Sequence, residues 1–123
     1  METAKHVNFD KYAEFVDAVT SDASKDFLSL SDRLVALDEK GANIERLLTA
    51  AVGINAEGGE FMEIVKKMIF QGKPWNEDNR DHLIIELGDV MWQVAAVAKD
   101  HGFTLSEICI HNLQKLWGRK DNG

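Results

Sequence analysis

The chain contains a single cysteine, Cys109, and a single proline, Pro74, among its 123 residues. One cysteine cannot build an intramolecular disulfide framework. Cys109 is flanked by apolar residues, and we expect a small buried core residue there rather than a nucleophile paired with His111, because buried free cysteines are usually inert. Pro74 follows Gly72 closely, and this combination predicts a firm helix stop.

Positive charge is also scarce, with 14 Lys and Arg against 21 Asp and Glu and a formal net charge of −7. The basic residues gather only near the end of the chain, at Lys115, Arg119 and Lys120. Nucleic acid is therefore not expected as a partner, because duplex binding depends on neutralising phosphates with basic side chains. An anionic ligand would need metal ions between itself and this acidic chain.

No apolar run reaches the length of a membrane span, because Glu86 and Asp89 interrupt the longest one. Residues 1–8 lack the apolar core of a signal peptide. We therefore expect a cytoplasmic protein without a membrane partner. The length is that of one ordinary domain with a real core.

Strand signals are missing as well, since no Asn-Gly or Asp-Gly turn separates alternating apolar runs. Helical spacing of apolar residues predicts an all-α bundle of about four main helices. We expect a helix from an Asn8 cap to about Ser21, one or two short helices over 26–40, and longer helices beyond. The expected organisation is one domain over 1–123, with a helical extension at 1–42 and a motif-bearing core at 43–119.

Glycine and capping residues punctuate that core. The expected helix ends and starts are Gly41, Asn43, Gly72, Asn76 or Asn79, Gly102 and Thr104. Gly58 and Gly59 fall inside a predicted helix, where each costs about 1 kcal/mol relative to alanine. Two such glycines predict either a break or very close packing at this point.

The segment from Leu83 to Ala98 is apolar at almost every position. Its polar residues form one narrow strip, made of Glu86, Asp89 and Gln93. A helix that is apolar nearly all round is expected to be buried, so the strip should face the protein interior. Carboxylates held there need a partner, most naturally a cation.

Two acidic pairs share the same spacing, Glu57 with Glu60 and Glu86 with Asp89. Residues three apart lie on one helix face, and two antiparallel helices could bring the pairs together. Four carboxylates would repel each other strongly, and Mg²⁺ or Mn²⁺ is the natural compensation for all-oxygen ligands. Glu63 lies one turn further and could be an auxiliary ligand or a general base.

Alternatives to this metal site remain open. Acidic residues three apart are common on solvated helix faces. A di-iron site needs Glu-x-x-His pairs, and no Glu here has a His three positions later. His82 extends the acidic strip and could touch substrate or be an exposed first-turn residue. Trp75 could stack on a base or plug the core.

Two segments, 50–60 and 86–92, carry a resemblance to a known family. They read Ala-Ala-Val-Gly-Ile-Asn-Ala-Glu-Gly-Gly-Glu and Glu-Leu-Gly-Asp-Val-Met-Trp. Together with Phe-Gln-Gly-Lys-Pro at 70–74 and Asn-Leu-Gln-Lys-Leu at 112–116, they resemble the MazG-like nucleoside triphosphate pyrophosphohydrolases over about residues 44–119. These all-α enzymes share a Glu-x-x-Glu … Glu-x-x-Asp signature.

The resemblance implies Mg²⁺-dependent cleavage of a (d)NTP between its α- and β-phosphates, with Mn²⁺ as a possible substitute. It also implies a dimer or dimer of dimers with sites near subunit interfaces. The implied metal ligands are Glu57, Glu60, Glu86 and Asp89, and Glu60 or Glu63 would act as general base. The implied substrate-binding residues are Lys67, Lys73, Trp75, Asn112, Lys115 and Arg119.

Other functions compete with this interpretation. The chain could be a non-catalytic helical oligomerisation module or a nucleotide sensor that does not cleave. A related branch of the family hydrolyses phosphoribosyl-ATP and provides an enzymatic alternative. The preferred base and sugar are not predicted.

Overall fold

The computed structural model describes residues 6–122, and within that range it contains helices and no strand. Five α-helices and one short 3-10 turn are present, so the all-α prediction is confirmed, whereas the count of about four main helices is not. The chain divides between Gly41 and Ala42 into two compact units. Among the helices of the described residues, none combines the length and the apolar character that a membrane span requires.

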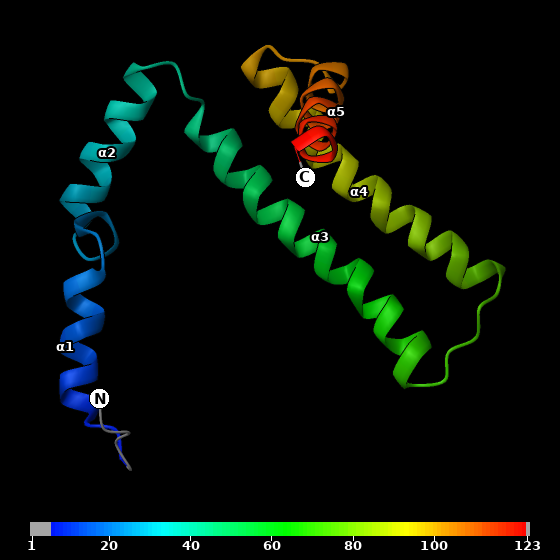
Figure 1. Ribbon diagram of the computed structural model, residues 1–123, viewed down its shortest axis with the longest axis horizontal. Helices are drawn as coiled ribbons and strands as arrows, with labels where there is room; N and C mark the ends of the chain where they lie inside the picture. The colour runs from blue at the N-terminus through cyan, green and yellow to red at the C-terminus, as the bar shows by residue number, and fades with distance from the viewer. Residues whose placement is uncertain (1–5, 123) are drawn as a thin grey trace. The chain divides into compact units, whose positions relative to one another are not determined.

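The first unit contains α1 (Phe9–Val19), η1 (Asp22–Ser24) and α2 (Phe27–Glu39) (Figure 1). Asn8 caps α1 as expected, since its side chain accepts hydrogen bonds from the backbone N–H groups of residues 10 and 11. Asp26 caps α2 and accepts from the Ser29 N–H and hydroxyl. Hydrogen bonding to the Ser29 hydroxyl is the largest cause that lowers the pKa of Asp26. The segment 26–40, where one or two short helices were expected, contains the single helix α2.

The second unit contains α3 (Ile44–Phe70), α4 (Glu77–His101) and α5 (Leu105–Asn122). Figure 1 shows α3 and α4 as a long antiparallel pair joined by a short connector, and α5 contacts α4. The expected caps are confirmed. Asn43 and Asn76 cap α3 and α4, and Thr104 Oγ1 accepts from the Glu107 N–H at the start of α5.

Glycines in the left-handed conformation end these helices where the sequence predicts. Gly41 has a φ of 97°, and Gly72, which follows α3, has a φ of 73°. Gly102 has a φ of 72° and closes α4, with the Phe103 N–H donating to the Ala98 carbonyl. The connector before α4 is fastened by the Asn79 side-chain amide, which donates to the Pro74 carbonyl at 2.7 Å. Strong local signals therefore set where α3 ends and where α4 begins and ends along the chain.

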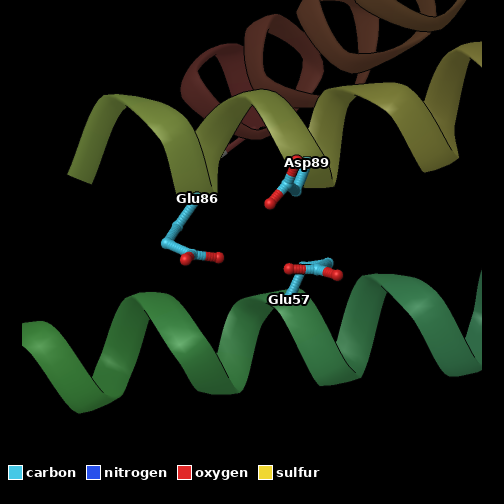
Figure 2. A group of neighbouring side chains, drawn as sticks. All are labelled: Glu57, Glu86 and Asp89. Atoms are coloured by element: carbon cyan, nitrogen blue, oxygen red, sulfur yellow. The ribbon is translucent and has the colours of Figure 1, made fainter. Parts of the chain in front are cut away.

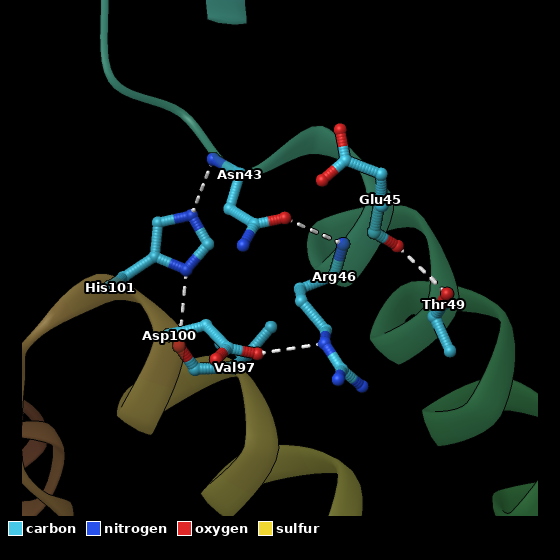
Figure 3. Close-up of polar contacts among 7 residues, drawn as sticks. All are labelled: Asn43, Glu45, Arg46, Thr49, Val97, Asp100 and His101. Atoms are coloured by element: carbon cyan, nitrogen blue, oxygen red, sulfur yellow. Dashed lines mark hydrogen bonds and ion pairs between the residues drawn. The ribbon is translucent and has the colours of Figure 1, made fainter.

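A histidine also fastens the end of the pair where α3 begins and α4 ends (Figure 3). His101 Nε2 accepts a hydrogen bond from the Asn43 backbone N–H at 3.1 Å, and His101 Nδ1 lies 3.1 Å from the Val97 carbonyl. Since Nε2 accepts, the ring proton must sit on Nδ1 and donate to Val97. One neutral imidazole thus bridges the first residues of α3 to the last turn of α4.

The expectation of a helix break or close packing at Gly58 and Gly59 is wrong within this chain. The helix α3 runs through both residues without interruption, and a methyl group added at either would meet no atom within 4 Å. Packing against α4 over many turns keeps α3 helical despite two weak helix formers. The close approach occurs at Gly53 instead, which lies directly against the Gln93 side chain of α4.

The expectation that α4 is buried on nearly all sides is also wrong for one chain. Its outward faces leave large apolar side chains exposed: Ile84, Ile85, Leu87, Met91 and Trp92. Cys109 on α5 is likewise exposed rather than part of a core. The physical reason is that α4 packs along its length on α3, which covers one face, and contacts α5 only sparsely within the described residues. The buried apolar residues of the described chain are small or few, namely Ala50, Ile64 and Ala98.

Candidate metal centre

Three carboxylates from two helices converge between α3 and α4. Glu57 of α3 points toward α4, and Glu86 and Asp89 of α4 point back toward it (Figure 2). One carboxylate oxygen from each residue lies within 4.8 Å of the others. We refer to Glu57, Glu86 and Asp89 as the carboxylate cluster.

Helix geometry explains why these side chains meet. Glu86 and Asp89 are three residues apart and therefore share one face of α4. That face is turned toward α3, because the less exposed apolar residues of α4, such as Val90 and Val94, lie on the same side. The prediction that the acidic strip faces the interior holds for Glu86, which is 9% exposed, whereas Asp89 is exposed at the edge of the pair.

The electrostatics of the cluster are unfavourable without a counter-charge. Burial is the main cause that raises the pKa of Glu57 above its usual value of 4.5, followed by the negative charge of Asp89 and by the neighbouring Glu86 carboxylate. The charges of Glu86 and Glu60 act in the same direction. Glu86 Oε2 is buried and has no hydrogen-bond partner among the described residues. Such an orphaned oxygen is costly to bury.

The donor set fits a hard divalent cation. All three groups offer carboxylate oxygen, the ligand type that Mg²⁺ and Mn²⁺ prefer. A cation here would partner the orphaned Glu86 oxygen and offset the repulsion that raises the pKa of Glu57. The residues present are therefore suited to hold the metal that the sequence led us to expect.

The other acidic candidates lie outside the cluster. Glu60 is exposed on α3, one turn beyond Glu57, and acts on Glu57 through its charge. Glu63 is half-buried and forms ion pairs with Lys66 at 3.4 Å and with Lys67 at 3.7 Å. Its negative charge is thus compensated by lysines of the same helix.

The remaining candidates are not joined to the cluster by any hydrogen bond or ion pair within residues 6–122. Lys73 and Trp75 are exposed in the connector, and the 68% exposure of Trp75 excludes the alternative of a core plug in one chain. The α5 candidates are all exposed as well, namely Asn112, Lys115 and Arg119. Their roles toward a substrate stay predictions.

Two residues near the cluster had no firm role in the sequence. His82 Nε2 lies 3.5 Å from Glu86 Oε1, one turn earlier on α4. Gln93, the last member of the polar strip, lies against Gly53. The i, i+4 spacing of His82 and Glu86 is a signal for the first contact. The Gln93 contact joins two helices, and sequence spacing within one helix cannot reveal it.

A hollow of about 240 Å³ lies elsewhere on the second unit, beside Arg46, Trp92 and Lys99. Asp100 also lines this hollow, and its carboxylate forms an ion pair with Arg46 Nε at 3.0 Å (Figure 3). No residue of the carboxylate cluster lines it. The hollow therefore does not mark the candidate site. The candidate site is the carboxylate cluster, where a buried oxygen lacks a partner among the described residues.

Comparison with known proteins identifies the family of the chain. The Gene 37 protein of Mycobacterium phage L5 is 43% identical over 83 residues, which cover 66% of this chain and 72% of the phage protein. No solved structure matches the chain significantly. The family model described as the MazG nucleotide pyrophosphohydrolase domain matches residues 45–123, which include all three residues of the carboxylate cluster. The chain therefore belongs to the MazG nucleotide pyrophosphohydrolase domain family.

Proposed function

We propose that this protein is a Mg²⁺-dependent pyrophosphohydrolase that acts on nucleoside triphosphates of the ribo or deoxyribo series and trims a nucleotide pool. One water molecule hydrolyses the bond between the α- and β-phosphates, and the products are a nucleoside monophosphate and pyrophosphate. The observation that carries the proposal is the convergence of Glu57, Glu86 and Asp89 with a buried, unpartnered oxygen, in a chain of the MazG family.

In this proposal Glu57, Glu86 and Asp89 hold Mg²⁺, or Mn²⁺ in its place, and Glu60 extends the set by one turn. A bound divalent cation supplies Lewis-acid polarisation of phosphate oxygens and lowers the pKa of a bound water. The chain itself carries a net charge of −7, so its carboxylates would repel a free triphosphate. This makes the activity strictly dependent on metal.

A carboxylate oxygen of Glu60 is the better placed acceptor for the proton of the attacking water. Glu60 is exposed and forms no ion pair among the described residues, whereas Glu63 is held by Lys66 and Lys67. A general base must approach the proton that it removes, and ion pairs with lysines would hold a carboxylate away from it. Lys67 and Lys73 would then offer positive charge to the phosphates from the α3 end of the site.

The decisive experiment is product identification. Purified protein is incubated with Mg²⁺ and each of the eight common NTPs and dNTPs, and the products are separated by anion-exchange chromatography. We expect monophosphate and pyrophosphate with at least one nucleotide, and no turnover with excess EDTA. Orthophosphate with diphosphate, or no turnover with any of the eight, would contradict the proposal.

A matched pair of variants links turnover to the cluster. Glu86→Gln should lower kcat/KM by about 100-fold or more, because it removes a buried charge at the reacting centre. Glu45→Gln makes the same chemical change on an exposed residue of α3, about 18 Å along the helix from Glu57. It should retain wild-type rates. If Glu86→Gln has the same kcat/KM as Glu45→Gln, α4 does not contribute to the site.

We also propose that the protein works as a homodimer or homotetramer. The exposed apolar faces of α4 support this, since monomeric proteins rarely leave so many large apolar residues on one element in water. Light scattering coupled to gel filtration should give two or four times the chain mass of 13.8 kDa. A monomeric mass at micromolar concentration would contradict this proposal and leave the hydrolytic one standing.

A further inference from the structure

The two oxygens of the Glu86 carboxylate differ in their surroundings. Oε1 lies 3.5 Å from His82 Nε2, while Oε2 is buried and has no hydrogen-bond partner among the described residues. The residue as a whole is 9% exposed, so water reaches it poorly. One oxygen thus faces an imidazole nitrogen at the outer limit of hydrogen-bonding distance, and the other is left available.

We infer that His82 is a positioning residue for the metal site: it holds Glu86 through Oε1 and leaves Oε2 to serve as the ligand atom. This inference rests on the proposed function, because it concerns the same cluster. Carboxylates that bind metals are themselves usually held by polar partners, which orient them before the ion arrives. His82 is the candidate for that role because its Nε2 lies 3.5 Å from Glu86 Oε1.

The placement of His82 supports orientation rather than substrate contact. It lies one turn before Glu86 on α4, so both side chains stand on the same helix face. The imidazole is 56% exposed, and Glu57 and Asp89 complete the cluster around Glu86. The contact uses Nε2, which can donate in the neutral ring as well as in the charged one.

Two substitutions at the same position separate this role from a general structural one. In His82→Gln the side-chain amide nitrogen reaches about as far as the imidazole Nε2, so a donor to Glu86 is retained. In His82→Asn the amide is one methylene shorter and stops near the place of Nδ1. Both variants remove the ring and the possibility of charge, so they differ mainly in reach. His111→Gln on the exposed face of α5 is a control for the loss of a histidine.

The test measures Mn²⁺ binding to the full chain without nucleotide, by electron paramagnetic resonance of the free ion at constant pH. His82→Asn should weaken binding by about 10–100-fold, the usual effect of losing a partner of a metal ligand. His82→Gln should stay within about threefold of wild type, and His111→Gln should match it. Circular dichroism spectra and urea midpoints identify a variant that fails to fold.

Two results would overturn the inference. If His82→Asn binds Mn²⁺ as tightly as wild type, His82 does not orient Glu86. If His82→Gln binds as weakly as His82→Asn, a donor at the Nε2 position is not what matters. Glu86→Gln separates the metal site from the role of His82. If Glu86→Gln loses Mn²⁺ binding while His82→Asn binds Mn²⁺ as wild type does, the metal site stands and only the role of His82 is refuted. Absence of Mn²⁺ binding in the wild type refutes both.

Discussion

Replacing Gly53 by alanine tests how closely α3 and α4 pack beside the carboxylate cluster. Gly53 lies on α3, one turn before Glu57, and faces Gln93 of α4. An added methyl carbon would stand 2.5 Å from Gln93 Nε2 and 2.8 Å from Gln93 Cγ. Cγ is near the backbone, so the clash cannot be relieved by moving the end of the side chain alone. The Gln93 side chain must change its rotamer, or the helices must separate.

The expected free-energy change has two opposing parts. Alanine is favoured over glycine inside a helix by about 1 kcal/mol. Overpacking a tight contact costs about 1–3 kcal/mol. Gly53→Ala should therefore lower the free energy of unfolding by about 0–2 kcal/mol in the wild type. In a Gln93→Ala background the clash is absent, and the same substitution should raise that free energy by about 1 kcal/mol.

Urea unfolding followed by circular dichroism measures all four members of this double-mutant cycle. One protein concentration is used throughout, because assembly would make stability depend on it. Gly59→Ala is the matched control: Gly59 is an exposed residue of the same helix, and no atom lies within 4 Å of the added methyl group. It should stabilise by about 1 kcal/mol. If Gly53→Ala stabilises as much as Gly59→Ala, or if the Gln93→Ala background leaves its effect unchanged, the close contact is not a real constraint.

Two further changes act on other contacts of the second unit. His101→Ala removes the acceptor of the Asn43 N–H and should lower the free energy of unfolding by about 1–3 kcal/mol. An unchanged midpoint of urea unfolding would show that water replaces the imidazole. In metal-free buffer the pKa of Glu57 is higher in the folded state than its usual value of about 4.5. Glu57 therefore contributes fully to the free energy of unfolding below about pH 4.5. This contribution is lost as the pH rises through the folded-state pKa. Thermal melts of Glu57→Gln should therefore show a flatter decline between pH 4 and pH 7 than wild type, and parallel curves would contradict the raised pKa.

Local signals in the chain predicted most of the helices and their ends. Asn8, Asn43 and Asn76 cap helices where expected, because a short polar side chain can accept from the free N–H groups of a first turn. Gly102 closes α4 because glycine adopts a positive φ without steric cost. These effects act over three or four residues, so no tertiary information is needed.

The same locality explains the errors. Gly58 and Gly59 predicted a break or a tight contact, yet only packing along the whole of α3 decides whether weak helix formers stay helical. Cys109 was expected in a core because its neighbours are apolar, but exposure depends on which elements lie over α5. Apolar spacing reports which face of a helix would benefit from burial, and not what covers it.

The candidate site divides in the same way. The spacing of Glu86 and Asp89 by itself determined that two carboxylates share one helix face. The apolar surroundings predicted that this face turns inward, which holds for Glu86 and not for Asp89. Only the tertiary structure decided that Glu57 completes the cluster, that Glu60 stays exposed, that Glu63 pairs with lysines, and that one oxygen of Glu86 is left without a partner. The physical reason is that helix periodicity fixes neighbours within a helix, whereas the register and separation of two helices are set by side chains that meet across them, such as Gln93 against Gly53.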